Sequence, residues 1–317
     1  MSFEATRVRR KGRVLLARPS GFCAGVERAI GTVEEALTRY GAPVFVRRQI
    51  VHSSHVIEDL ERRGARFVSS EEEVPKGAVC ILSAHGVAPE VRSAAARRGL
   101  RTIDATCPLV AKVHVEVRRY AREGRRIVLI GRRGHDEVEG TLAEAPDRTH
   151  VVADEADIDA LPIPADAPVA YAIQTTLAVD DTAPLVARLR ERFSDLVGPK
   201  KDDICYASQN RQAAVKAIAP ECDLVLVAGA RNSSNSNRLV EVAQRSGPPA
   251  HLVGDAAELR TEWLIGVEVV GLSAGASAPR RLVDAILARL AELGYDEVAT
   301  RELTTERVHF PAPRMPA

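Results

Sequence analysis

Short apolar runs alternate along the chain with longer stretches in which apolar residues recur every three or four positions. This alternation predicts β-strands followed by amphipathic helices, which is typical of an α/β fold. The runs that we expect to form strands are 13–17, 44–47, 78–83, 102–105, 127–130, 169–173, 224–228 and 267–272.

Several helix ends are also recognisable. The first helix is expected to begin near Ala24 and to end at Gly41, because the apolar residues between them fall on one helical face. Pro108 and Pro279 favour the starts of two further helices, since the N–H groups of a first turn have no partner inside the helix.

The length of 317 residues is too great for one small core, so two or three modules of about 100–150 residues are expected. Stretches rich in proline, glycine or polar residues at 162–168 and 198–203 are weak linker signals.

Charge and composition narrow the possible partners. The 44 Lys and Arg residues are balanced by 43 Asp and Glu residues, so the chain has no global attraction to nucleic acid or to an anionic membrane. No apolar run approaches the roughly 20 residues needed to cross a bilayer, and residues 1–13 do not resemble a secretory signal. Five cysteines, an odd number, do not suggest a disulfide framework. We therefore expect a cytoplasmic protein whose thiols serve metal binding or catalysis.

Three cysteines stand where a predicted strand or loop meets a predicted helix. These are Cys23, Cys107 and Cys205, whereas Cys80 and Cys222 lie in or beside apolar strand patterns and are interpreted as packing residues. A thiol near a helix N-terminus has a lowered pKa, and the thiolate is the form that binds metal. The wide spacing excludes a local finger, but three modules could each give one ligand to a shared centre. An iron–sulfur cluster with one open iron and a catalytic zinc both remain open at this point.

Other reactive side chains also follow predicted strands, where α/β sheets bind ligands. His52, His85 and His135 stand beside Gly or Ser at strand ends, where imidazoles can bind an anion or transfer protons. His114 is interpreted as a surface or packing residue. Glu137 is either the acidic first turn of a helix or an acid–base group.

Two segments rich in small polar residues suit a phosphate group. Residues 232–237 read Asn-Ser-Ser-Asn-Ser-Asn between a buried strand and a helix, and 275–277 precede a second helix. A P-loop that hydrolyses nucleotides is disfavoured because the Walker lysine motif is absent. The residues thus indicate redox or Lewis-acid chemistry on a phosphorylated small molecule.

At this level of detail the chain resembles the LytB family of 4-hydroxy-3-methylbut-2-enyl diphosphate reductases. The matching segments occur in family order and lie at 21–26, 51–52, 83–87, 104–110, 134–135, 137–141, 174–177, 203–207, 232–239 and 274–279. The chain departs from the family pattern at Ser53, where Asn is frequent, and at Arg132 and Arg133.

The resemblance implies three similar α/β modules with pseudo-threefold symmetry around a central 4Fe-4S cluster. Cys23, Cys107 and Cys205 match its three ligands, and the fourth iron stays open. We expect modules at 13–107, 108–201 and 202–293, followed by a C-terminal tail at 294–317 that lies on the surface.

The resemblance also implies the activity and the roles of its residues. Family members cleave an allylic C–O bond reductively and release isopentenyl and dimethylallyl diphosphate, with a ferredoxin or flavodoxin as electron donor. Glu137 matches the proton-relay acid and Thr175 the hydroxyl that holds it, with His135 as a further catalytic residue. The residues that match the diphosphate-binding set are His52, His85, His135, Ser233, Ser234, Asn235 and Ser277. An iron–sulfur hydro-lyase, a redox sensor and a zinc-stabilised phosphate-binding module are the competing hypotheses.

Overall fold

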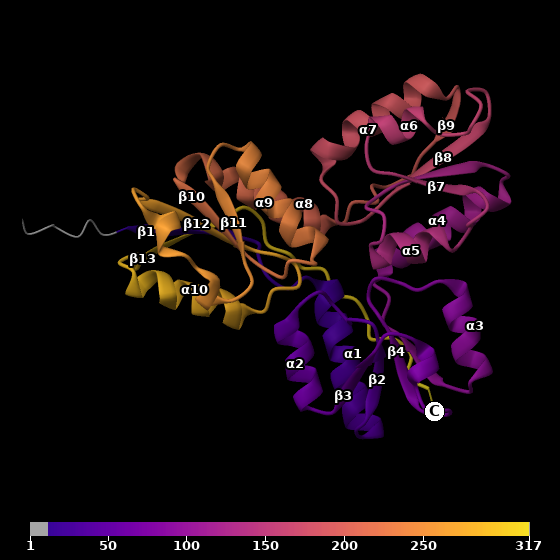
Figure 1. Ribbon diagram of the computed structural model, residues 1–317, viewed down its shortest axis with the longest axis horizontal. Helices are drawn as coiled ribbons and strands as arrows, with labels where there is room; N and C mark the ends of the chain where they lie inside the picture. Colours follow the sequence, from indigo (N-terminus) through magenta and orange to yellow (C-terminus); the bar gives the residue numbers. More distant parts are fainter. Residues whose placement is uncertain (1–11, 317) are drawn as a thin grey trace, which may run out of the picture. The chain divides into compact units, whose positions relative to one another are not determined.

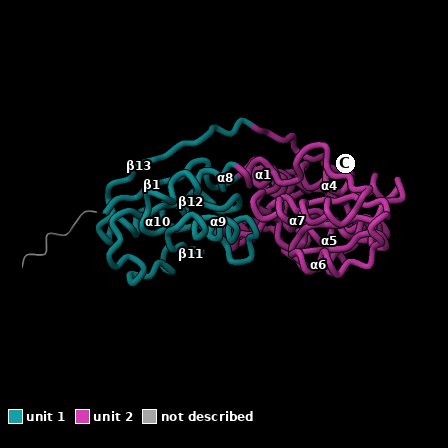
Figure 2. The backbone as a smooth tube through the Cα atoms, turned by 90° about the horizontal axis from the view of Figure 1, so that it is seen from above, with its two compact units in different colours: residues 1–22, 210–307 teal, residues 23–209, 308–317 magenta. Residues whose placement is uncertain are grey.

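The computed structural model describes residues 12–316 and divides the chain into two compact units (Figure 2). Within the described range, one unit consists of residues 12–22 and 210–307, and the other of residues 23–209 and 308–316. We call them the terminal unit and the central unit.

The terminal unit is built on one five-stranded parallel sheet, with the strand order β11-β10-β12-β1-β13. Its strands are β1 (Arg13–Arg18), β10 (Leu224–Ala228), β11 (Ala250–Val253), β12 (Val269–Ala274) and β13 (Glu297–Glu302). Its helices are α9 (Ser234–Arg245), α10 (Arg280–Glu292) and most of α8 (Tyr206–Ile218).

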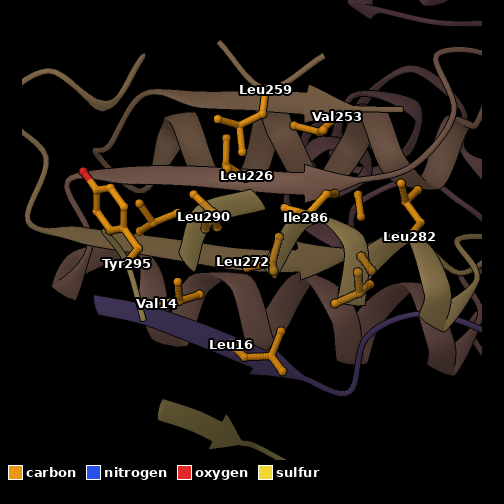
Figure 3. Close-up of a cluster of buried hydrophobic side chains, with 14 of the residues drawn as sticks. Val14, Leu16, Leu226, Val253, Leu259, Leu272, Leu282, Ile286, Leu290 and Tyr295 are labelled. Carbon is orange, nitrogen blue, oxygen red and sulfur yellow. The ribbon is translucent and has the colours of Figure 1, made fainter. Parts of the chain in front are cut away.

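Alternate residues of these strands serve two cores on opposite faces of the sheet. Leu226 and Leu272 pack with Ile286 of α10 on one face, as Figure 3 shows. Val225 and Val227 belong to the cluster that α8 and α9 cover on the other face. Both faces of the sheet are therefore covered by helices, which is why its strands read as continuous apolar runs.

The central unit contains two four-stranded parallel sheets, ordered β3-β2-β4-β5 and β7-β6-β8-β9 (Figure 1). The first sheet consists of β2 (Val44–Arg47), β3 (Ala65–Val68), β4 (Val79–Leu82) and β5 (Arg101–Asp104), with helices α1 (Ala24–Tyr40), α2 (Ser54–Arg62) and α3 (Pro89–Arg97). The second sheet consists of β6 (Arg126–Ile130), β7 (Thr149–Val152), β8 (Pro168–Ile173) and β9 (Asp195–Val197), with helices α4 (Pro108–Arg122), α5 (Asp136–Leu142), α6 (Glu155–Asp159) and α7 (Val179–Arg192). The α/β class and the three parallel-sheet modules are confirmed.

The expected module boundaries need correction at both ends of the chain. The strand that begins at residue 13 does not belong with 23–107: β1 pairs in parallel with β12 and β13 in the terminal unit. Its four central residues are buried, so β1 requires a neighbouring strand on each side. The predicted tail at 294–317 contains β13, which pairs with β1 although all six of its side chains are exposed.

The weak linker signal at 162–168 does not mark a boundary, because this loop leads into β8 between helices and strands of one sheet. The first helix begins at Ala24 and ends before Gly41, whose φ of 72° suits glycine. Pro108 opens α4 as predicted, whereas Pro279 is the residue that precedes α10. In the part of the chain that the structure describes, no helix is long and apolar enough to cross a membrane.

Candidate active site

The three predicted metal-binding cysteines converge within the central unit. Cys23 and Cys107 each occupy the N-cap of a helix, α1 and α4, and Cys205 directly precedes α8. A Cβ atom placed on Gly25 would lie 2.8 Å from the Cys107 sulfur and 3.8 Å from the Cys23 sulfur, so glycine leaves room for both. The Cys205 thiol belongs to the same group. Burial is the largest cause that raises the pKa of Cys107, and nearby charge on Cys23 and on Cys205 raises it further.

Backbone hydrogen bonds fix two of these cysteines to neighbouring strand ends. The Cys107 N–H donates to the Ala84 carbonyl at 3.0 Å, and the Cys205 N–H donates to the Thr175 carbonyl at 2.9 Å. The N–H of Ser208 donates to the Cys205 sulfur at 3.3 Å. Cys107 is therefore held one residue from His85, and Cys205 is held against Thr175.

The Cys107 and Cys205 thiols have higher pKa values than their place at helix N-termini suggests. Burial raises the pKa of Cys107 to about 12, although backbone N–H groups of α4 oppose the shift. Burial likewise raises the pKa of Cys205 to about 11, with Ser208 opposing. The expectation of lowered pKa values is wrong for these two thiols, since desolvation outweighs the helix terminus. They require a bound cation to become thiolates at neutral pH, which fits a metal centre.

Three histidines form a second cluster in the central unit. The His52 and His85 rings stack with centroids 4.1 Å apart, and the His135 ring lies 5.5 Å and 6.0 Å from them. Burial is the largest cause that lowers the pKa of all three, and it brings the pKa of His135 to about 4. Among the described residues, His85 Nδ1 and His135 Nε2 are buried without a hydrogen-bond partner. Neutral imidazoles with such nitrogens can donate hydrogen bonds to an anion.

Glu137 is a buried carboxyl group that Thr175 holds on both oxygens. One oxygen accepts a hydrogen bond from the Thr175 N–H at 2.6 Å, and the other accepts one from its hydroxyl at 3.0 Å. Burial raises the pKa of Glu137 to about 7, and the two hydrogen bonds oppose the shift. Thr175 does not cap α7, which begins at Val179 with Ala178 as its N-cap. A carboxyl group with this pKa can deliver and accept a proton near neutral pH.

The predicted phosphate cradle lies in the terminal unit, at the N-terminus of α9. Ser233 is the N-cap, and its hydroxyl oxygen accepts a hydrogen bond from the Ser236 N–H at 3.3 Å. The Asn235 side-chain oxygen accepts a hydrogen bond from the Ala276 N–H at 2.8 Å, which joins the cradle to the loop that holds Ser277. The side chains are buried but uncharged, and the helix terminus favours an anion.

The residues that we interpreted as packing residues are buried in the structure. Cys80 and Cys222 are buried in apolar clusters. His114 is buried in α4, where its Nδ1 lies 2.7 Å from a Glu144 oxygen.

Asp136 was missed by the sequence analysis although it stands between His135 and Glu137. It forms an ion pair with Arg48. One carboxylate oxygen of Asp136 and one ring nitrogen each of His52 and His85 all lie within 4.8 Å of one another. An acidic residue between two predicted site residues was the feature of the sequence that could have identified it. The departure at Arg133 is a surface feature, since this residue pairs with Asp157 at 3.1 Å.

The chain is similar to known proteins over nearly its whole length. The LytB protein family matches residues 14–291 of the chain. The chain is 55% identical to the 4-hydroxy-3-methylbut-2-enyl diphosphate reductase of Burkholderia pseudomallei, over 95% of this chain and 96% of that protein. It is 56% identical to the enzyme of the same name from Aromatoleum aromaticum, with the same coverage.

Two solved structures are similar to the whole fold. The E-1-hydroxy-2-methyl-but-2-enyl-4-diphosphate reductase of Plasmodium falciparum has a TM-score of 0.92 at 39% identity and covers 96% of both chains. A second structure has a TM-score of 0.63 at 34% identity and covers 89% of this chain and 99% of its own. That protein is named as (E)-4-hydroxy-3-methyl-but-2-enyl diphosphate reductase, the terminal enzyme of the non-mevalonate pathway.

Proposed function

Because this chain belongs to the LytB protein family, we propose that it reduces 4-hydroxy-3-methylbut-2-enyl diphosphate to isopentenyl and dimethylallyl diphosphate. The observation that carries the proposal is the proximity of a buried acid to a thiol ligand: Thr175 donates two hydrogen bonds to Glu137, and its carbonyl accepts the Cys205 N–H at 2.9 Å. Reductive removal of a hydroxyl group needs an electron source and a proton source at one place.

The donor set fits a 4Fe-4S cluster held by Cys23, Cys107 and Cys205. In such a cluster each thiolate binds a different iron, and one iron stays open for the substrate. When bound, the cluster supplies electrons and a Lewis-acidic iron for C–O cleavage.

Glu137 is the proposed proton donor to the leaving hydroxyl group. The substrate C–O bond breaks as two electrons and two protons are taken up, and the oxygen leaves as water. Thr175 fixes both carboxyl oxygens, so the acid is oriented before the substrate arrives. The absence of bulk water around a group that is 3% exposed keeps its proton available for this transfer.

The diphosphate group is the proposed ligand of the remaining residues. His52, His85 and His135 offer neutral N–H donors in the central unit, and an anion would favour their protonation. Donors of this kind are what a highly charged diphosphate group requires. Those of the terminal unit are Ser233, Ser234, Asn235 and Ser277. The electrons come from a small ferredoxin or flavodoxin.

One anaerobic experiment separates this proposal from its competitors. The reconstituted protein is examined by absorbance and electron paramagnetic resonance, and is then assayed on the allylic diphosphate with dithionite and a mediator. We expect an iron–sulfur spectrum and turnover that depends on the reductant. Turnover without reductant would indicate a hydro-lyase, and a colourless zinc protein would exclude the cluster. A cluster protein that consumes no substrate would leave the redox-sensor hypothesis.

A further inference from the structure

Each helix that follows a predicted cluster cysteine carries a cation about one and a half turns after that cysteine. The cation is five or six residues further along the chain in every case. The pairs are Cys23 with Arg28 on α1, Cys107 with Lys112 on α4, and Cys205 with Arg211 on α8.

Arg28 binds the backbone that leads to the second cysteine. Its Nη1 donates to the carbonyl oxygens of Ala105 and Thr106, both at 3.1 Å. These are the two residues before Cys107, and the Thr106 carbonyl belongs to the peptide bond that contains the Cys107 nitrogen. The Nε of Arg28 donates to the Pro311 carbonyl at 2.8 Å.

Lys112 binds the backbone that leads to the third cysteine. Its Nζ donates to the carbonyl oxygens of Lys201 at 2.6 Å and Asp202 at 3.1 Å. It also donates to a carboxylate oxygen of Asp203 at 3.0 Å, two residues before Cys205. All three donors of this ammonium group are thus directed to one segment.

Arg211 binds the backbone that leads to the first cysteine. Its Nε and Nη2 donate to the Gly21 carbonyl at 3.0 Å and 2.8 Å, and Nη2 also donates to the Phe22 carbonyl at 3.1 Å. Glu306 balances the charge, with an oxygen 3.0 Å from Nη1. The Arg211 side chain is only 1% exposed, and such a buried charge is stable only when fully paired. Its partners are Glu306 and the two residues before Cys23.

We propose that Arg28, Lys112 and Arg211 are positioning residues for the cluster ligands, each holding the cysteine that comes next in a cyclic order. The order runs from the helix of Cys23 to Cys107, from the helix of Cys107 to Cys205, and from the helix of Cys205 back to Cys23. Ordinary packing does not require this order, because each cation could bind any carbonyl oxygen within reach. The inference rests on the proposed function, since the three cysteines have this role only as ligands of one cluster.

The cyclic order has a physical consequence for metal binding. A charged donor on carbonyls one to four residues before a cysteine restricts the motion of the backbone that leads to the thiol. Each ligand is therefore oriented by the helix that begins at another ligand. Loss of one cation should loosen the next cysteine while leaving the cysteine of its own helix in place. Partners of this kind typically change metal affinity by about 10–100-fold.

The test uses the full chain, purified without air, and two variants that keep side-chain length but remove the donors. In Arg28→Met we expect faster hydrogen–deuterium exchange by about tenfold at residues 105–107, with residues 201–205 unchanged. In Lys112→Met we expect the reverse pattern. The reporters are sound because the amides of Cys107 and Cys205 are hydrogen-bonded in the structure. Cluster loss to an iron chelator should accelerate by about 10–100-fold in both variants.

Three further variants complete the design. Arg122→Met, on the exposed end of α4, should match the parent in exchange and in chelator-driven loss. Arg28→Lys and Lys112→Arg keep a cationic donor and should restore most of the cluster lifetime. Exchange that rises at the variant's own helix instead of the next cysteine, or rises everywhere, overturns the proposal, as does a cluster lifetime equal to that of the parent.

Failure of the proposed function gives a different result. If the parent protein binds no iron–sulfur cluster, the spectra show it directly, and the crossed exchange pattern can still be measured on the cluster-free chain. Arg211→Met is informative only if it folds, because its side chain is buried; the two less buried cations decide the outcome without it.

Discussion

The central unit and the terminal unit both contain buried polar side chains, but these differ in kind. The central unit gathers ionisable side chains: three thiols, three imidazoles and the Glu137 carboxyl group. The cradle of the terminal unit consists of hydroxyl and amide groups that do not titrate near neutral pH. This difference assigns the reacting groups to the central unit, and it leaves the cradle to bind its ligand through uncharged hydrogen-bonding groups.

Their hydrogen bonding differs in the same sense. In the cradle, Ser233 and Asn235 already accept backbone N–H groups, so the cradle is shaped before a ligand binds. In the central unit, His85 and His135 retain buried nitrogens without a hydrogen-bond partner among the described residues. Substitutions of the thiol ligands and of Glu137 in the central unit should therefore affect the reaction itself, and those in the cradle should affect binding.

The largest effect is expected from loss of a cluster ligand. Cys107→Ala should abolish turnover, because two thiolates cannot hold the cluster and the electron source is lost. Iron and sulfide content per chain is the measurement. Cys80→Ala, which removes a buried thiol from an apolar cluster, is the matched control and should retain both. Normal iron content in Cys107→Ala would remove this cysteine from the ligand set.

The next largest effect is expected at Glu137. Glu137→Gln keeps the size of the side chain but removes the proton, so kcat should fall by about 10²–10⁴-fold with little change in KM. Iron content and the cluster spectrum should stay those of the parent. Glu139→Gln, on the exposed face of the same helix, controls for a change of charge in α5. Comparable kcat values for the two variants would contradict the assignment of Glu137.

The candidate site residues could be located in the sequence because they stand where a strand or loop meets a helix, within distinctive segments. Cys23, Cys107 and Cys205 are three such cases, and the structure brings them together in one unit. Their pKa values could not be predicted from local sequence. A helix N-terminus lowers the pKa of a thiol, but the burial that opposes it depends on segments a hundred residues away.

The module boundaries were harder to predict for a related reason. A strand such as β1 is recognisable from its apolar run, but the run does not say which strands lie beside it. β13 gave no signal at all, because its six residues are exposed and its pairing with β1 depends on backbone groups. The edge strands β3, β7, β9 and β11 are short and less apolar, and they were missed as well.

A pH profile of kcat/KM tests the protonation state of Glu137 in the central unit directly. Burial raises the pKa of Glu137 to about 7, and the proposed donor must be protonated. As the pH rises through this value the acid form is lost, so kcat/KM should fall by about tenfold per pH unit on the alkaline side. Below pH 7 the same group is protonated and should not limit the rate. Glu137→Gln should lack this limb, and a parent profile that is flat from pH 6 to pH 9 would contradict the role of Glu137.

The smallest effect is expected in the cradle, where Asn235→Ala tests the other half of the comparison. This change removes the acceptor of the Ala276 N–H and loosens the link between two corners of the predicted phosphate site. One hydrogen bond of this kind corresponds to an increase in KM of about 3- to 10-fold. The value of kcat and the pH at which kcat/KM begins to fall should stay unchanged. Gln244→Ala is the matched control, because its amide also binds a backbone group, the Ala250 carbonyl, at the opposite end of α9. A fall in kcat without a change in KM would show that the cradle takes part in the reaction, and the division between a reacting unit and a recognising unit would then fail.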